Sequence, residues 1–257
     1  MKTNKLILSL LTAFLISIIG CGKKEAVKQM SAEERFRLGM SKFQKEDYLE
    51  AIEEFKTVVL QYPGSKVADS AQFFIGECRF LREEYILAAY EYDLLINQMP
   101  SSGLIALARF RRASCYYELS PNSYLDQAYT KKAIDDYQEF LEYHPKDSLA
   151  HLAEQRINEL NTKLAKKDYE NGLTYMHMEY YKSAIFYFDE VLEKYHDTPY
   201  AELSLLKKAE ALIYRKRFYE AKEAIENFKK KYPHSKYINE ADKLQLSIET
   251  RIAEKSK

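Results

Sequence analysis

The sequence of 257 residues has no tryptophan, three cysteines, six prolines and seven glycines. It also lacks runs in which apolar and polar residues alternate, which a half-buried β-strand would show. Net charge is absent as well, because 39 basic residues balance 39 acidic ones. A nucleic-acid-binding protein or a polybasic membrane-surface protein would carry an excess of basic residues. The abundance of alanine, leucine, glutamate and lysine instead predicts an all-α protein.

Motifs for catalysis or metal binding are also missing. The five histidines include no HExxH pair, and the chain has no glycine-rich phosphate loop and no GxSxG motif. Acidic residues alternate with lysines as they do on solvated helix faces. We therefore expect no enzymatic activity, no catalytic residue, no metal site and no cofactor.

The first twenty residues resemble a bacterial secretion signal. Lys2 and Lys5 precede an apolar segment from Leu6 to Ile19, which is long enough for a signal peptide and too short to span a bilayer comfortably. Gly20 and Cys21 follow, and the stretch "IIGC" resembles a lipobox.

A lipobox implies that residues 1–20 are removed and that Cys21 carries the lipid, including palmitate-type acyl chains. Two or more chains anchor a protein stably to a membrane, and residues 21–31 would form the tether. Gly22, which is not aspartate, favours the outer membrane over the inner one. A plain signal peptide with an incidental cysteine is the alternative.

The rest of the chain repeats itself. A small residue recurs with a spacing of 37 residues (76 − 39 = 37, and 209 − 172 = 37), and an alanine follows it by twelve residues in four units. The third unit spaces them by twenty, which indicates an eight-residue insertion around Glu118 to Asp126, and fourteen extra residues precede the fourth unit. The pairs are Gly39 and Ala51, Gly76 and Ala88, Ala113 and Ala133, Gly172 and Ala184, and Ala209 and Ala221.

This pattern predicts paired antiparallel helices. Small residues let two helices approach closely, and the aromatic residue one turn after the alanine, such as Phe55 or Tyr92, fills the adjacent space. A proline after most second helices ends them. The pattern resembles the tetratricopeptide repeat, so we expect an α-solenoid of five helix pairs over residues 32–233 with a capping helix from Ser235 to about Ala253.

The order of these features resembles the BamD family of outer-membrane lipoproteins. The chain has a lipobox, a short tether, five repeats, an insertion in repeat three and a long connection before repeat four. Repeat four ends in "YHDT" (Tyr195 to Thr198), where the family usually has proline in place of His196. The resemblance implies a scaffold facing the periplasm that helps assemble β-barrel proteins. Residues 32–118 would bind targeting signals of unfolded outer-membrane proteins. Residues 119–257 would dock the barrel subunit BamA, with other assembly lipoproteins nearby.

Aromatic side chains recur on one face of the first helices of repeats one to three. They predict a groove for an extended peptide, and nearby arginines would meet its terminal carboxylate. The alternatives are that the rings belong to the core between repeats and that the arginines lie on a solvated face. The candidates are Phe36, Phe73 and Phe110 in one row, Phe43, Phe80 and Tyr117 in a second, and Arg79, Arg82, Arg109, Arg111 and Arg112.

Cys78 and Cys115 lie 37 residues apart and so occupy the same position in successive repeats. Such positions should be ~10 Å apart, too far for a disulfide. We expect two buried free thiols.

Two other functions are compatible with an exported repeat protein. A Tol-Pal-associated envelope protein would usually show a coiled coil before its repeats, and none is visible between Gly22 and Ala32. A hydrolase of the cell wall, or a cofactor for one, would need a catalytic constellation that the sequence lacks.

Overall fold

The computed structural model describes residues 30–255, and the described part of the chain consists of eleven α-helices without strands. The predicted signal peptide, the predicted lipidation site Cys21 and most of the predicted tether lie outside the described residues. The helices are α2 (Ala32–Gln44), α3 (Tyr48–Gln61), α4 (Ala68–Leu81), α5 (Tyr85–Gln98), α6 (Ile105–Glu118), α7 (Ala128–Tyr143), α8 (Ala150–His177), α9 (Tyr181–Lys194), α10 (Pro199–Tyr214), α11 (Phe218–Lys231) and α12 (Ile238–Lys255).

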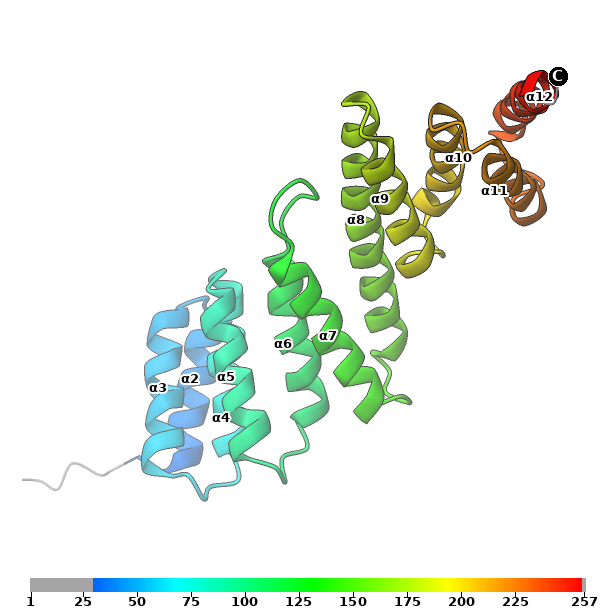
Figure 1. The fold of residues 1–257 in the computed structure, drawn as a ribbon. Helices are drawn as coiled ribbons and strands as arrows, with labels where there is room; N and C mark the ends of the chain where they lie inside the picture. The colour runs from blue at the N-terminus through cyan, green and yellow to red at the C-terminus, as the bar shows by residue number, and fades with distance from the viewer. Residues whose placement is uncertain (1–29, 256–257) are drawn as a thin grey trace, which may run out of the picture.

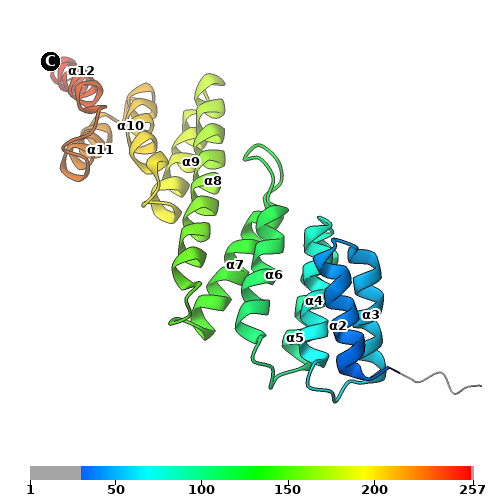
Figure 2. The ribbon, with the colours of Figure 1, turned by 180° about the vertical axis from the view of Figure 1, so that it is seen from behind.

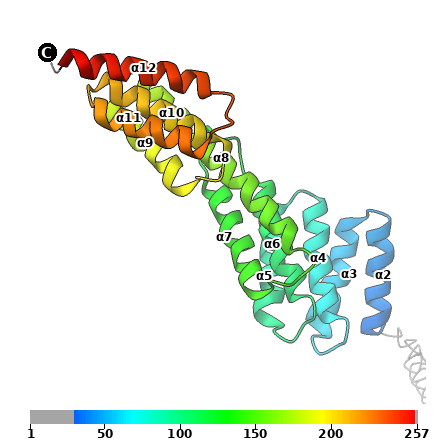
Figure 3. The same ribbon diagram turned by 90° about the vertical axis from the view of Figure 1, so that its right-hand side faces the viewer.

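Consecutive helices form five hairpins that stack side by side into an elongated solenoid (Figure 1). The pairs are α2–α3, α4–α5, α6–α7, α8–α9 and α10–α11, and α12 covers the last pair (Figure 3). The two ends of the described chain lie at opposite ends of the stack. The predicted solenoid with its capping helix is confirmed.

In three of the five pairs, close packing depends on a glycine at the position of the repeated small residue, which is alanine in repeats three and five. A Cβ added to Gly39 would lie 2.6 Å from the Phe55 ring, and one added to Gly172 would lie 2.4 Å from the Phe188 ring. The small residue therefore faces the aromatic ring of the second helix, one turn beyond the repeat alanine.

Four of the five pairs are joined by a three-residue turn with the same backbone. Its middle residue has φ between 59° and 64°, a left-handed conformation that costs a residue with a side chain about 1–2 kcal/mol. The residues at this position are Glu46, Glu83, Glu179 and Lys216.

The insertion in repeat three and the extra residues before repeat four are both visible in the structure. The third pair is joined by a nine-residue loop, residues 119–127, which we call the insertion loop, and α7 starts two residues early. The fourteen extra residues before repeat four extend a helix, because α8 has 28 residues where α4 and α6 have 14. Pro199, the proline that follows repeat four late, begins α10.

Helix α8 joins two parts of the stack (Figure 2). Its first half packs on α7, and its second half packs on α9 and α10. The predicted boundary between residues 118 and 119 falls between the two helices of repeat three, whereas the change of packing partners occurs inside α8. Within residues 30–255, no helix is long and apolar enough to cross a bilayer.

Candidate functional site

The first predicted row of groove rings lies in the core of the helix pairs. Phe73 and Phe110 are each only 7% exposed. Phe73 packs 5.6 Å from Tyr92 and Phe110 packs 5.4 Å from Tyr137, measured between ring centroids. The expectation that these two rings line an open groove is corrected, because each fills the space between its own two helices. Phe36, in the same position of repeat one, is half-buried.

The second row is only half-buried, but its rings already have neighbours. Phe43 lies against Phe74, with ring centroids 5.2 Å apart. The Arg111 guanidinium lies 4.1 Å from the centroid of Phe80. The Tyr117 hydroxyl donates a 2.5 Å hydrogen bond to Glu159 of α8. These rings keep part of their surface open to solvent.

One ring that the repeat register did not single out connects repeats one and two. Phe74 of α4 contacts Phe36, Phe43 and Phe55 from the preceding pair. The signal available in the sequence was the doublet "FF" at positions 73 and 74, whose two rings point to different neighbours on a helix.

The predicted carboxylate-binding arginines are already paired with carboxylates of the chain. Arg79 Nε donates to Glu91 over 2.9 Å, and Arg82 binds Glu84 over 2.8 Å. Arg111 binds both carboxylate oxygens of Glu77, at 2.6 and 2.7 Å. Bidentate pairs of this kind are the strongest that arginine forms.

The pair formed by Arg111 and Glu77 also reaches a buried tyrosine. The Tyr92 hydroxyl donates to Glu77 over 2.5 Å. Burial and then the Glu77 charge raise the pKa of Tyr92. Burial acts to lower the pKa of Arg111, but the hydrogen bonds to Glu77 together with the electrostatic interactions with Tyr92 and Glu77 outweigh burial and raise it. Tyr92 therefore stays neutral and Arg111 stays charged at neutral pH.

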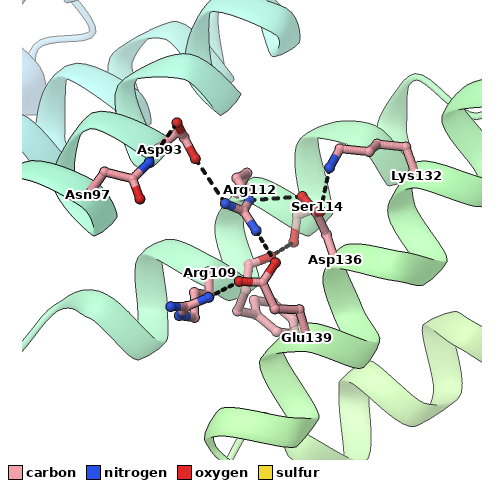
Figure 4. Close-up of polar contacts among 9 residues, drawn as sticks. Asp93, Asn97, Arg109, Arg112, Ser114, Lys132, Asp136 and Glu139 are labelled. Atoms are coloured by element: carbon pink, nitrogen blue, oxygen red, sulfur yellow. Dashed lines mark hydrogen bonds and ion pairs between the residues drawn. The ribbon is translucent and has the colours of Figure 1, made fainter.

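Arg112 is the centre of the largest ionic cluster (Figure 4). Its three nitrogens donate to Asp136 at 2.9 Å, to Asp93 at 2.9 Å and to Glu139 at 2.6 Å. Arg109 also pairs with Glu139. The cluster joins α5, α6 and α7, and its Asp136 is only 1% exposed. An incoming peptide carboxylate would have to displace these pairs to reach either arginine.

The partners of these bases follow the repeat register. Three residues after the repeat alanine, the second helix carries Glu54, Glu91 and Asp136 in repeats one to three. Each accepts a bond from a base on the first helix of its pair. This recurring acid was the sequence signal that could have predicted the pairing. The groove prediction rested on the aromatic residues instead.

Both predicted free thiols are confirmed. Cys78 and Cys115 are buried and unpaired with each other. Burial raises the pKa of each thiol to about 12, so both are protonated and unreactive near neutral pH.

Repeat four exposes an aromatic cluster that sequence reasoning missed. Tyr175 of α8 stacks on Tyr187 of α9 with centroids 5.4 Å apart. Tyr180 lies 6.5 Å from Tyr175, and Phe186 lies 5.5 Å from Tyr187. Tyr180 is 61% exposed and Phe186 is 57% exposed. We call these four side chains the repeat-four aromatic surface.

The described residues offer no site for a metal ion. Between residues 30 and 255, no group of three or more histidine, cysteine, aspartate or glutamate side chains is arranged to hold one.

Comparison with known proteins agrees with the repeat architecture. A curated relative, the outer membrane protein assembly factor BamD of Rickettsia prowazekii (strain Madrid E), is 27% identical over 246 residues, which cover 95% of this chain and 98% of the relative. A tetratricopeptide repeat profile matches residues 203–235, which span α10 and α11.

Two solved structures are similar to the chain at low identity. The TPR2AB domain of yeast Sti1, in a structure described as its pHSP90 complex, is 17% identical, with a TM-score of 0.42 over 85% of this chain and 98% of that one. A tetratricopeptide repeat protein from Parabacteroides merdae is 18% identical, with a TM-score of 0.37 over 86% of this chain and 73% of that one.

A family model also matches most of the chain. The profile of a family described as outer membrane lipoprotein matches residues 28–218, about three quarters of the chain. The chain therefore belongs to this outer membrane lipoprotein family, the one that the resemblance to BamD indicates.

Proposed function

We propose that this chain is a lipid-anchored scaffold on the periplasmic face of the outer membrane and that it helps assemble β-barrel proteins without catalysing a reaction. The observation that carries the proposal is family membership over most of the chain, together with a full-length relative that is an outer membrane protein assembly factor. The elongated stack of helix pairs fits a scaffold, because solenoids present extended surfaces to other polypeptides.

We place the docking of the barrel subunit on the C-terminal repeats, at the repeat-four aromatic surface. Tyrosine and phenylalanine are enriched at the centres of protein interfaces, where their large rings are buried by the partner. Tyr180 and Phe186 each have more than half of their surface exposed, next to the Tyr175–Tyr187 stack. Rings held by stacking lose little conformational freedom when a partner covers them.

The N-terminal repeats would receive the targeting signals of unfolded outer-membrane proteins. With Phe73 and Phe110 buried, the candidate contacts are the half-buried rings of Phe36, Phe43, Phe80 and Tyr117. The peptide would then lie over ring edges, with its carboxylate near the arginines. Because carboxylates of the chain already compensate the charges of these arginines, this contact would be weak. Weak binding suits a factor that must release its substrate.

Co-purification from detergent-solubilised envelopes tests the docking proposal. The full chain carrying Tyr180→Ala and Phe186→Ala should recover at least about tenfold less barrel subunit than the unaltered chain, since two such anchors are each worth more than 1 kcal/mol. Leu60→Ala is the matched control, because Leu60 is 78% exposed in α3, far along the stack. Equal recovery by the double variant would remove the aromatic surface from the interface. Recovery of Tol or Pal components in place of a barrel subunit would overturn the proposed function itself.

A separate binding measurement tests the N-terminal repeats. Phe80→Ala with Phe43→Ala should weaken binding of a C-terminal peptide from a barrel protein, while far-UV circular dichroism shows unchanged helicity. Unchanged peptide affinity would exclude this face as the signal-binding surface.

A further inference from the structure

The insertion loop has no assigned role, yet it is more tightly bonded than a surface connection needs to be. Ser123, Gln127 and Thr130, in or next to the loop, are all buried. Loops that merely connect helices lie on the surface and are usually mobile. The bonds of this loop therefore indicate a structural task beyond joining α6 to α7.

The hydrogen bonds inside the loop form a directed chain. The Thr130 hydroxyl donates to the Gln127 side-chain oxygen over 2.7 Å, so its single proton is used. The 2.6 Å contact between Ser120 Oγ and Thr130 Oγ1 must then be donated by Ser120. Gln127 in turn donates to the carbonyl oxygens of Asn122, at 2.8 Å, and Leu125, at 3.0 Å. Every member of this buried network is satisfied, which makes the loop rigid.

Two lysines of α8 complete the chain. Lys163 Nζ donates to Ser120 Oγ at 2.7 Å and to the Ser120 carbonyl oxygen at 3.2 Å. Lys167 Nζ donates to the Leu125 carbonyl oxygen at 2.5 Å. Ammonium groups form stronger hydrogen bonds than neutral donors. These two lysines thus anchor the loop to α8 at points one turn apart, and Ser123 Oγ donates a further, longer hydrogen bond of 3.4 Å to Glu170 of the same helix.

These anchors flank the place where α8 changes partners. Up to Leu164, its buried side chains belong to the core cluster of α6 and α7. From Tyr169 onward its neighbours come from the next pairs, with ring centroids 5.9 Å from Phe188 and 5.6 Å from Tyr200.

Little else holds the two parts of the stack together. No helix of the group α2–α7 packs extensively against any of α9–α12 within the described residues, although Tyr195 of the α9–α10 turn reaches the α6–α7 cluster. A helix of 28 residues is about 42 Å long, and long helices bend unless they are supported. Thr162 Oγ1 bonds to the Asn158 carbonyl oxygen at 2.8 Å, an arrangement that favours bending near this point.

We propose that the insertion loop fixes the angle between the N-terminal part (α2–α7) and the C-terminal part (α9–α12) of the solenoid by clamping the middle of α8. It does so through Lys163 and Lys167, which hold α8 against the rigid network of Ser120, Gln127 and Thr130. Without the clamp, α8 bends about its middle and the two parts sample a wider range of angles. The inference concerns the shape of the chain and does not depend on the proposed function.

Distances between spin labels test the clamp in the full chain. Labels are attached in detergent to Leu60→Cys in α3 and Leu246→Cys in α12, two exposed positions in the two parts, in a Cys21→Ser background. The buried thiols Cys78 and Cys115 stay unlabelled because burial raises the pKa of each. A second label pair, Leu60→Cys with Tyr90→Cys in α5, reports on the N-terminal part alone.

Lys163→Met with Lys167→Met should widen the distance distribution between the two parts roughly twofold and leave the N-terminal pair unchanged. Lys222→Met is the matched control, because it removes a lysine that pairs with Glu226 on its own helix, α11, away from the insertion loop. An unchanged distribution in the double variant, with full helicity, would overturn the proposal. If the double variant loses helicity, Ser120→Ala takes its place. It removes the hydroxyl that joins Lys163 to Thr130, and an unchanged width there would overturn the proposal equally.

Discussion

Repeats one to three and repeats four to five use different chemistry at the same positions. In repeats one to three, the residue three positions after the repeat alanine is an acid. It binds a base on the first helix of its pair, as Glu91 binds Arg79. In repeat four the matching pair is Tyr175 stacked on Tyr187. In repeat five the matching residues are Leu212 and Ala224, both in an apolar core cluster.

This difference shows that one helix-pair geometry tolerates an ionic, an aromatic or an aliphatic contact at its centre. The ionic contacts compensate charge inside the N-terminal part and leave little free for a ligand. The aromatic contact instead continues to the surface as Tyr180 and Phe186. The two parts therefore differ less in fold than in what they offer to other proteins.

Among the variants that test this difference between the two parts, we expect removal of Arg112 to lower the free energy of unfolding most. Arg112→Met leaves the buried carboxylate of Asp136 with only Lys132 and should lower the free energy of unfolding by about 3 kcal/mol. The counterpart in repeat four, Tyr187→Phe, keeps its stacked ring and should change it by no more than about 0.5 kcal/mol. Urea denaturation followed by circular dichroism measures both. Equal losses in the two variants would contradict the ionic character assigned to the N-terminal part.

High pH should weaken the chain through the two buried thiols of its N-terminal part. The folded-state pKa of Cys78 is raised to about 12, so its stabilising contribution is complete below the unfolded pKa of about 8.5 and is lost as the pH rises toward 12. By pH 10 the loss for one thiol is about 2 kcal/mol. Cys78→Ala should flatten the decline of stability between pH 8 and 10 by that amount. An identical pH slope in this variant would show that the thiol is not ionised on unfolding.

The glycine-to-ring contact should be sensitive to a single methyl group. In Gly172→Ala the new Cβ would lie 2.4 Å from Phe188, and the cost of overpacking exceeds the gain in helix propensity. We expect a net destabilisation of about 1 kcal/mol. Adding Phe188→Leu should recover it, because repeat five already combines Ala209 with Ile225 at these positions.

The matched control for this contact is Gly64→Ala, since a Cβ on Gly64 would meet no atom within 4 Å. Thermal unfolding of the three variants gives the comparison. A more stable Gly172→Ala would mean that the helices separate without cost.

The smallest expected effect is the same in both parts. Glu83→Gly and Lys216→Gly place glycine at left-handed positions, with φ of 60° and 59°. Relief of backbone strain exceeds the entropy that glycine adds to the unfolded chain, so each should stabilise by about 0.5 kcal/mol. Opposite signs in the two parts, measured by thermal unfolding, would show that the turns differ despite their shared backbone.

The sequence predicts those features that repeat along the chain. Gly39, Gly76 and Gly172 recur in a fixed register with their alanines, and this register predicted the helix pairs, the capping helix and the buried thiols. The extra residues before repeat four were also predicted, because they break the register. Their number, fourteen, equals the length of a first helix such as α4, and in the structure they lengthen α8 by that amount.

Features that depend on neighbours distant in the sequence were not predictable in this way. Periodicity places Phe73 and Phe110 on one helix face, but it does not say whether that face meets the second helix or a peptide. The pairing of Arg112 with Asp136 joins two helices across 24 residues, and only their packing brings the charges together. Tyr180 has one aromatic counterpart, Tyr129 of repeat three, and Phe186 has one, Tyr90 of repeat two. Because each ring recurs only once, the repeat register did not single them out.

Depletion of the protein in its own cells tests the central claim most directly, with folded β-barrel protein in the outer-membrane fraction as the measured quantity. A scaffold of barrel assembly predicts that folded barrels fall as the protein is depleted, while their unfolded forms accumulate in the periplasm. An undiminished amount of folded barrel protein after depletion would contradict the account.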